Sequence, residues 1–310
     1  MKYLSLFSGI GGFELGIHDA FPDAQCVGFS EIDKYAIKVY QSNFPEHKNY
    51  GDIKDIDISS LPDFDMLVGG FPCQDLSIAK VNRKGLNGER SGLFWTMLSI
   101  LRLKNPKYFC FENVASMPKR DRGIITNELG VEPIMINAAL VSAQSRKRLF
   151  WCNWDVRQPE DRNILLKGIL ESGEELKIGE RKRGKAYCLD ANYWKNENLK
   201  HHLSHHLRQL IVDDPQTVML YHLEHGYKKR KLEELPDKYP TLHANSPGSN
   251  HMLLQKKILR KLYVVECERL QCFPDGWTEG VSNTQRYKQL GNAVNVEVVK
   301  HIMNELRRSQ

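Results

Sequence analysis

The stretch KYLSLFSGIGGFELG, Lys2 to Gly16, decides the fold class of this chain. Its apolar run KYLSLF predicts a β-strand, SGIGG predicts a tight turn, and a helix is expected near Phe13–Phe21. Glycines at Gly9, Gly11 and Gly12 would let the backbone approach a ligand, and the helix N-terminus offers free N–H groups. The spacing is not GxGxxG, so an ordinary tight strand-to-helix turn remains the alternative.

The same strand-and-helix alternation continues through the first half of the chain. Further strands are expected at residues 24–30, 64–70, 107–114, 133–141 and 148–154, and further helices at 35–44 and 92–103. Buried-type strands alternating with amphipathic helices predict an α/β fold with a mainly parallel sheet. Ligands of such folds bind at the carboxyl ends of the strands, where FSGIGG, GGFPC and ENV would all lie.

Composition excludes several classes of protein. The chain has 310 residues, 41% of them hydrophobic, and no apolar run approaches the roughly 20 residues of a membrane span. Seven scattered cysteines without a CxxC pair predict a reducing compartment, the cytoplasm, and neither a disulfide framework nor a zinc site. The histidine run HHLSHH has metal-binding spacing, but no cysteine or carboxylate completes a set nearby, so we predict no metal.

The character of the chain changes after Trp154. Residues 151–260 are polar and hold 19 lysines and arginines against 15 acidic residues, together with eight of the eleven histidines. Helical periodicity returns after Leu262. We therefore predict two domains, one formed by residues 1–150 plus 263–310 and a smaller, irregular one formed by residues 151–262. The basic surplus permits a polyanionic partner but is also typical of a solvated surface.

Cys73 is placed unusually, after two glycines and a proline in VGGFPCQDLS, Val68 to Ser77. Pro72 fixes its own φ, and the glycines allow unusual backbone angles, so the turn is suited to present the thiol. Glu112 ends a buried-type strand near the same sheet edge and needs a partner or a purpose there. Arg146 and Arg148, two apart in an extended segment, suit anionic oxygens. An inert cysteine, a salt-bridged glutamate and a solvated strand edge are the structural alternatives.

Two carboxylates indicate a nucleoside-type cofactor. Glu31 ends the second predicted strand, where a carboxylate can accept hydrogen bonds from ribose hydroxyls. Asp52 follows the next apolar stretch and could accept an amino group of adenine. A thiolate, a glutamate and paired guanidinium groups together suit addition to carbon 6 of a pyrimidine, which makes carbon 5 nucleophilic toward a methyl donor.

At this point the sequence resembles the cytosine-5 DNA methyltransferases, in order and along nearly the whole chain. The matching segments are SLFSGIGG (5–12), GGFPCQDLS (69–77), ENV (112–114), QSRKR (144–148), RKLYVVECERLQCFPD (260–275) and QRYKQLGNAV (285–294). Ser5 stands where many members have aspartate, and Tyr263 replaces a threonine. The stretch before the arginines lacks the tyrosine and GVPQ of many bacterial members.

The resemblance implies a Rossmann-like methyltransferase fold, S-adenosylmethionine as cofactor, double-stranded DNA as partner and a flipped target cytosine. It makes Cys73 the nucleophile, places Glu112 at ring nitrogen 3, and has Arg146 and Arg148 contact the ring carbonyl. The implied cofactor residues are Phe7, Gly9, Gly11, Gly12, Glu31, Ile32, Asp52, Ile53, Pro72, Asn292 and Val294. The implied DNA contacts are Gln74, Ser77, Arg83, Lys84, Arg90, Arg183 and Arg208.

The resemblance also suggests a monomeric modification enzyme of bacterial or phage origin, with a restriction endonuclease as companion but not in a stable complex. Three rival functions remain. A tRNA-methylating relative shares the catalytic core, although its CFT signature is absent here. A member without catalysis would have lost the cysteine, the glutamate or the glycine turn, which this chain retains. A Rossmann oxidoreductase is disfavoured by the glycine spacing and by the ordered later motifs.

Overall fold

The computed structural model describes residues 1–72, 92–171, 174–175, 184–186, 188–189, 191, 193, 210–213, 219–223, 250–254 and 258–310. Its strands are β1 Lys2–Leu6, β2 Gln25–Ser30, β3 Met66–Gly70, β4 Tyr108–Val114, β5 Ile134–Asn137, β6 Lys147–Cys152, β7 Glu174–Glu175, β8 Leu210–Asp213, β9 Met219–Leu223, β10 Asn250–Leu254 and β11 Ile258–Lys261. Its α-helices are α1 Gly12–Ala20, α2 Lys34–Asn43, α3 Leu93–Lys104, α4 Lys119–Leu129, α6 Val264–Leu270, α7 Asn283–Asn292 and α8 Val296–Ser309.

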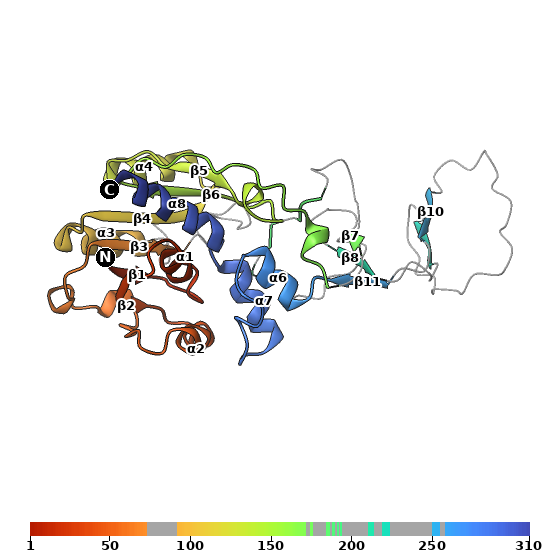
Figure 1. The fold of residues 1–310 in the computed structure, drawn as a ribbon, viewed down its shortest axis with the longest axis horizontal. Coiled ribbons are helices and arrows are strands. Elements are labelled where there is room, and N and C mark those ends of the chain that lie inside the picture. Colours follow the sequence, from red (N-terminus) through yellow and green to blue (C-terminus); the bar gives the residue numbers. More distant parts are fainter. Residues whose placement is uncertain are drawn as a thin grey trace, which may run out of the picture.

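A six-stranded sheet forms the centre of the molecule, in the order β2-β1-β3-β4-β6-β5 (Figure 1). Neighbours from β2 to β4 pair in parallel, whereas β6 runs antiparallel to both β4 and β5. The expected α/β fold with a mainly parallel sheet is therefore confirmed. The ends of β1, β3 and β4 meet at one edge of the sheet, because these three strands are parallel neighbours.

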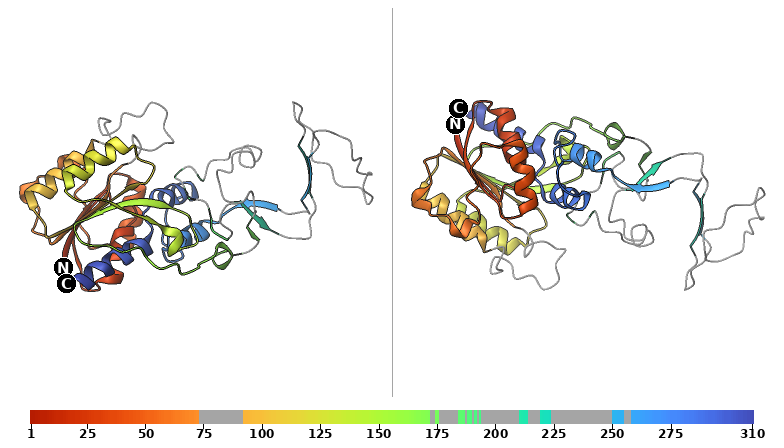
Figure 2. Two further views of the ribbon diagram at one scale, coloured as in Figure 1. Left: turned by 90° about the horizontal axis from the view of Figure 1, so that it is seen from above. Right: turned by 90° about the horizontal axis from the view of Figure 1, so that it is seen from below.

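Helices cover both faces of this sheet and bury its alternating side chains. On one face, Leu4 and Leu6 of β1 pack in a cluster with α3 and α4. On the other face, Tyr3 of β1 packs in a cluster with α1 and α8. Alternate residues of one strand thus enter opposite cores, which is the period-two pattern of a sheet buried on both sides. The last helix, α8, lies against the first, α1, and brings the two termini close together (Figure 2).

A third apolar cluster lies beyond the end of the sheet. It joins Ala36 and Val39 of α2 to residues of α6 and α7, and to Leu166, Ala186 and Leu189 of the polar segment. Farther out lie a three-stranded sheet, β11-β8-β7, and the β9–β10 pair (Figures 1 and 2). The segment after β6 still contacts α8, through the ion pairs of Arg157 with Glu305 and of Arg162 with Glu297. The division into two domains itself stays a prediction.

The structure differs from the sequence-based expectations at strand β5 and at helix α4. The segment 133–141 was expected to be one strand, but β5 ends at Asn137 and a 3₁₀ turn follows over Ala138–Leu140. The Asn137 side chain accepts the N–H groups of Ala139 and Arg146, which stabilises the turn over a longer strand. Helix α4 was missed, because its polar sequence offers only Ile125 and Leu129 as large buried apolar residues.

The helix α7 was likewise not anticipated, although its sequence carries a recognised motif. The helices and strands expected around the glycine-rich turn do match α1, β2, α2, β3, α3 and β4 within a few residues at their ends. No helix in the described ranges is both long enough and apolar enough to cross a membrane.

Candidate active site

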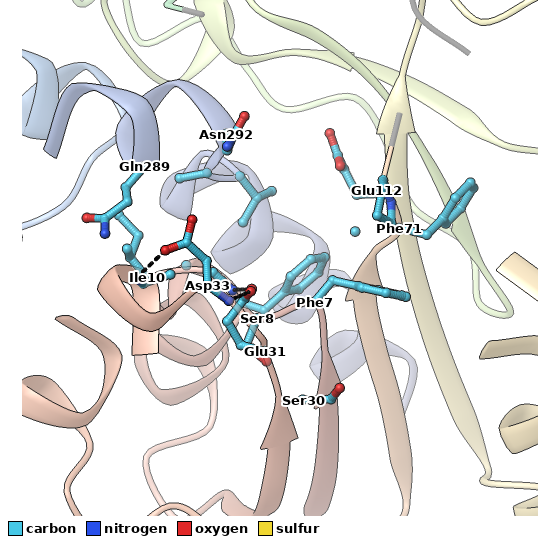
Figure 3. A pocket seen from close by; sticks show the side chains of 18 of the residues that line it. Phe7, Ser8, Ile10, Ser30, Glu31, Asp33, Phe71, Glu112, Gln289 and Asn292 are labelled. Atoms are coloured by element: carbon cyan, nitrogen blue, oxygen red, sulfur yellow. Dashed lines mark hydrogen bonds between the residues drawn. The ribbon is translucent and has the colours of Figure 1, made fainter. Parts of the chain in front are cut away.

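One cavity of about 550 Å³ opens at the carboxyl ends of β1, β3 and β4. Figure 3 shows Glu112 and Phe71 on one side of it, Asn292 and Gln289 on another, and Phe7 and Glu31 between them. The predicted site residues that line it are Phe7, Gly9, Gly12, Glu31, Ile32, Asp52, Ile53, Pro72, Glu112, Arg146, Arg148, Asn292 and Val294. Segments from both ends of the chain therefore meet in a single space, which is large enough for a small organic ligand.

The glycine-rich turn after β1 forms the floor of the cavity. Phe7, Gly9 and Gly11 have φ values of 55°, 57° and 89°, so the chain enters the left-handed region three times within this turn. Gly11 caps α1, and it is the one predicted cofactor residue that the cavity does not include. The turn is held by Glu31, whose Oε2 accepts the N–H of Gly9 at 2.9 Å.

Glu31 is oriented by three main-chain N–H groups. Besides Gly9, the N–H groups of Ile32 and Asp33 donate to its Oε1 at 2.8 and 2.9 Å. A carboxylate has about four lone-pair sites, so acceptor capacity remains for hydroxyl groups of a ligand. Asp52, whose Oδ1 accepts the N–H of Lys54, provides a second carboxylate in the same cavity.

The chemistry of this part of the cavity fits an adenosine-containing cofactor. Two carboxylates can accept from hydroxyl and amino groups, and an apolar side chain lies beside them, because Ile32 is 69% exposed at the cavity wall. An exposed isoleucine next to acceptor groups can pack on a flat ring. The donor and acceptor set therefore suits a nucleoside with an aromatic base.

The other side of the cavity is built on the antiparallel pair β4–β6. Glu112 lies opposite Phe150, and Arg148 lies opposite Val114, which makes Glu112 and Arg148 diagonal neighbours. Arg148 Nε is 2.8 Å from Glu112 Oε1, and the two side chains are only 16% and 15% exposed. The salt-bridged alternative for Glu112 is thus observed, within a cavity that also leaves both groups open to a ligand.

Gly70 makes room for this glutamate. It pairs with Glu112 across β3 and β4, and a Cβ on Gly70 would lie 3.0 Å from Glu112 Oε2. That separation is tighter than ordinary van der Waals contact, so any side chain at this position would push the carboxylate aside. Gly70, the second glycine of the GGFPC segment, therefore leaves the space that the carboxylate of Glu112 in the ENV segment occupies.

Asn113 was not singled out from the sequence, yet it ties these two segments together. Its side chain is 1% exposed, donates to the carbonyl of Phe71 at 2.9 Å and accepts the N–H of Val114 at 2.8 Å. Phe71 is two residues before Cys73. The middle residue of ENV thus fixes the chain where it enters the predicted nucleophile turn.

Arg146 is almost completely buried, with 3% exposure, so the solvated-edge alternative is wrong for it. Its guanidinium donates to the main-chain carbonyls of Leu189, Gly291 and Ala293. Burial, and next the positive charge of Arg148, lower the pKa of this arginine from its ordinary value. A buried cation of this kind is stable only when its donors are satisfied.

Lys288 and Asp33 form an ion pair at the cavity wall that the sequence did not reveal. Lys288 Nζ lies 2.8 Å from Asp33 Oδ2 and joins α7 to the start of α2, which Asp33 caps. Partial burial opposes ionisation of Asp33, but the hydrogen bonds from Lys288 and from the first amides of α2 outweigh it and lower the pKa of the carboxyl. The pair connects the C-terminal motif to the segment after Glu31.

Several predicted residues lie outside the described part of the chain. They are the nucleophile candidate Cys73 and the candidate DNA contacts Gln74, Ser77, Arg83, Lys84, Arg90, Arg183 and Arg208. The histidine run at residues 201–206 also lies outside it. The roles of all site residues, described or not, remain predictions.

Comparison with known proteins gives a consistent family. The family model for C-5 cytosine-specific DNA methylases matches residues 1–308. The chain is 30% identical to the type II methyltransferase M.NlaX of Neisseria lactamica, over 99% of this chain and 96% of that protein. It is 31% identical to M.HaeII of Haemophilus aegyptius, over 99% and 93%. A segment of 129 residues, 41% of the chain, is 46% identical to an orphan methyltransferase of Bacillus phage rho11s, covering 25% of that protein.

Solved structures agree with the observed fold. The methyltransferase EhMeth of Entamoeba histolytica superposes with a TM-score of 0.70 at 18% identity, covering 100% of this chain and 98% of its own. A DNMT2 structure from Spodoptera frugiperda gives 0.67 at 19% identity, with 99% of each chain covered. The family match over nearly every residue establishes that this chain belongs to the C-5 cytosine-specific DNA methylases, enzymes that use S-adenosylmethionine as methyl donor.

Proposed function

We propose that this enzyme methylates carbon 5 of a flipped cytosine within a short duplex DNA sequence, through a covalent bond from Cys73 to carbon 6. The observation that carries the proposal is the single cavity that contains both the Glu31 side and the Glu112–Arg148 pair. A methyl donor and its acceptor must lie within reach of each other, and one cavity holds the groups suited to each.

Each residue has a defined task in this proposal. The Cys73 thiolate attacks carbon 6, since the thiolate and not the thiol is the nucleophile. Glu112 hydrogen-bonds ring nitrogen 3 and the exocyclic amine, and Arg148 holds the ring carbonyl while keeping the Glu112 carboxylate in place. The bound cofactor would supply the electrophilic methyl group that carbon 5 receives, with the demethylated thioether as leaving group. Loss of the carbon 5 proton then breaks the bond between carbon 6 and Cys73, which restores the aromatic ring and the free thiolate.

The cofactor is assigned to the opposite part of the cavity. Glu31 would accept from the ribose hydroxyls, Asp52 from the adenine amino group, and Ile32 would pack on the adenine ring. Support comes from the orientation of Glu31 by three N–H groups, which leaves its remaining lone pairs directed in advance of binding. Asn292 and Val294 would close the cavity from the C-terminal side.

Sequence recognition is assigned to residues 151–262, with the basic residues among them as candidate contacts. The chemical motifs end before Phe150 or begin after Leu259, while the surplus charge and most histidines lie between them. A chimera that carries the matching segment of a relative with a different known specificity should methylate the relative's sites, which genome-wide mapping of methylated cytosines would show. An active chimera that keeps the original sites would place recognition elsewhere.

The biological setting belongs to the same proposal. A modification role, either beside a restriction endonuclease or as a solitary phage enzyme, is supported by the type II and orphan enzymes among the relatives. We propose a monomer in the cytoplasm that forms no stable complex with a nuclease.

The decisive experiment is expression of wild type and of Cys73→Ser in a host without cytosine methylation, followed by bisulfite sequencing. Wild type should protect cytosines at one short sequence, and the serine variant should protect none while still binding S-adenosylhomocysteine. A serine variant with near wild-type turnover would refute the covalent mechanism. Methyl transfer by the purified enzyme to tRNA but not to duplex DNA would refute the substrate.

A further inference from the structure

We propose that Arg146 is a positioning residue rather than a contact to the target base. Together with Gln271 it holds the turn between α7 and α8, and thereby sets the Asn292–Val294 edge of the cavity. This inference rests on the proposed assignment of that edge to the cofactor. It replaces the contact to the ring carbonyl that the resemblance implied for Arg146.

The donors of Arg146 are already used. Nη1 donates to the Leu189 carbonyl at 2.8 Å and contacts Cys188 Sγ at 3.4 Å. Nη2 donates to the carbonyls of Gly291 at 3.1 Å and Ala293 at 2.8 Å. The remaining donor, Nε, is buried and has no partner within the described residues, so a ligand in the cavity cannot reach it without rearrangement. No N–H group of this guanidinium is therefore presented to a base.

Arg148, two residues later, has the opposite surroundings. Its side chain keeps 16% exposure, lines the cavity and pairs with the Glu112 carboxylate. The two arginines of the QSRKR segment thus have different partners and different proposed roles. Both arginines border the cavity, but Arg148 is directed at the Glu112 carboxylate, whereas the Nη groups of Arg146 donate to the chain around the cavity.

Gln271 holds the same turn from the other side. It is fully buried, and its Nε2 donates to the carbonyls of Leu290 at 2.6 Å and Ala293 at 3.4 Å. The main-chain carbonyl of Gln271 accepts the N–H of Val296, the first residue of α8. The Ala293 carbonyl therefore receives hydrogen bonds from both Arg146 and Gln271, and the turn is clamped between them.

The clamp answers a specific need of this helix end. The last carbonyls of a helix lack partners inside the helix, and a cation near them is favoured by the helix dipole. Here α7 ends at Asn292, directly at the cavity, so the groups that satisfy its carbonyls also decide where Asn292 and Val294 stand. Leu189 belongs to the predicted recognition segment, so the same guanidinium also fixes that segment to the cavity wall.

Arg146→Lys is the sharpest test, because lysine keeps the charge but cannot span three carbonyls with a planar fork. We expect the dissociation constant of S-adenosylhomocysteine, measured by calorimetry without DNA, to rise by about tenfold. The kcat at saturating cofactor and DNA should stay within about threefold of wild type, since the groups at the base are untouched. Arg148→Lys should do the reverse, with an unchanged dissociation constant and a kcat lowered by about a hundredfold.

Two control variants distinguish failure of this inference from failure of the proposed cofactor site. Arg162→Lys alters an exposed ion pair with Glu297 and should change neither quantity. Asn292→Ala tests the cofactor edge itself. An unchanged affinity for S-adenosylhomocysteine in Asn292→Ala would refute the proposed cofactor site, whereas an altered affinity there with an unaltered one in Arg146→Lys would refute the clamp alone.

The remaining outcomes also decide the matter. A variant Arg146→Lys with unchanged cofactor affinity and a kcat as low as that of Arg148→Lys would restore the base contact and overturn the inference. A lower melting temperature with unchanged affinity and kcat would reduce Arg146 to a merely structural role and overturn it as well. If Arg146→Lys does not fold, Gln271→Leu carries the same test, and wild-type cofactor affinity in that variant would overturn the clamp.

Discussion

The parallel and antiparallel halves of the central sheet build their parts of the cavity in different ways. On the parallel half, β2-β1-β3, the two carboxylates assigned to the cofactor contact nearer neighbours in sequence: Glu31 accepts from Gly9, 22 residues away, and Asp52 accepts from Lys54. On the half with the antiparallel strand, β4-β6-β5, the partners are distant. Arg146 reaches Gly291 and Ala293, 145 and 147 residues along the chain.

This difference predicts that substitutions at the glycine turn and at the Glu112–Arg148 pair will affect different measured quantities. A turn held by local hydrogen bonds can be complete before any ligand binds, so changes in it should act mainly on cofactor affinity. A pair such as Glu112–Arg148 depends on the register of β4 against β6, and it faces the proposed base. Changes there should act mainly on the rate of the chemical step.

The largest expected effect in this comparison comes from Glu112→Gln. The amide keeps the shape of the side chain but loses the charge that pairs with Arg148 and the capacity to protonate a ring nitrogen. General acid–base groups contribute typically 10² to 10⁴ in rate, so we expect kcat to fall by about that range. Single-turnover methyl transfer measures it, with calorimetry of S-adenosylhomocysteine as the companion measurement.

The contrast between the glycine turn and the Glu112–Arg148 pair would be broken if Glu112→Gln weakened cofactor binding as strongly as it slowed methyl transfer. Glu128→Gln is a matched control, because Glu128 forms an exposed ion pair with Arg102 on the helix layer. It should alter neither measurement.

Glu31→Ala should have the next largest effect, and on the other quantity. A lost hydrogen bond between a charged acceptor and a ribose hydroxyl is worth about 1.5–3 kcal/mol, so the affinity for S-adenosylhomocysteine should fall by roughly 10- to 150-fold for each such bond. The alanine also releases the N–H groups of Gly9, Ile32 and Asp33, which loosens the turn. Glu31→Gln retains an acceptor and should lose less.

Calorimetry on the DNA-free enzyme measures the dissociation constant of S-adenosylhomocysteine for the Glu31 variants directly. Glu132, an exposed glutamate whose loosely placed partner is Arg122, supplies the matched alanine control. Unchanged affinity in Glu31→Ala would remove this residue from the cofactor site and leave its carboxylate as an internal support of the turn only.

The same contrast explains what the sequence could reveal. The glycine turn, Glu31 and Asp52 were predicted because local composition determines them: a strand, a turn that needs positive φ, and a carboxylate at a strand end. The contacts of Arg146 could not be predicted, because its partners are the main-chain carbonyls of Leu189, Gly291 and Ala293. Every residue has such a carbonyl, so the residue types do not indicate which ones accept.

Helix α4 and the short strand β5 show the limits for the fold itself. The polar α4 has a weak apolar stripe, and β5 stops where one asparagine side chain captures two main-chain N–H groups. Both outcomes depend on tertiary packing that overrides local pattern. Asn113 was part of a recognised motif, but its task depends on the Phe71 carbonyl across the sheet, which only the assembled strands bring near.

The smallest expected effect on methyl transfer concerns Glu14 of α1, on the parallel half beside the glycine turn, where the change is one of stability. It is fully buried, and its Oε1 accepts from the Tyr40 hydroxyl at 3.0 Å, while Oε2 has no partner within the described residues. Burial raises the pKa of this carboxyl from 4.5 to about 7, although the nearby hydroxyl groups of Ser5, Tyr40 and Ser8 oppose the rise. The folded protein therefore keeps this proton to higher pH than the unfolded chain does.

The sign of the pH dependence follows from that difference. The contribution of Glu14 to the free energy of unfolding is fully present below pH 4.5 and is lost as the pH rises toward about 7. Glu14→Gln removes it, so wild type should lose stability relative to the variant over this interval, by at most about 1.4 kcal/mol per pH unit. Urea unfolding of both proteins from pH 4.5 to 8 measures the difference. Parallel profiles would mean that Glu14 is ionised in the folded protein throughout, and that the local half of the sheet tolerates a buried charge that its surroundings do not pair.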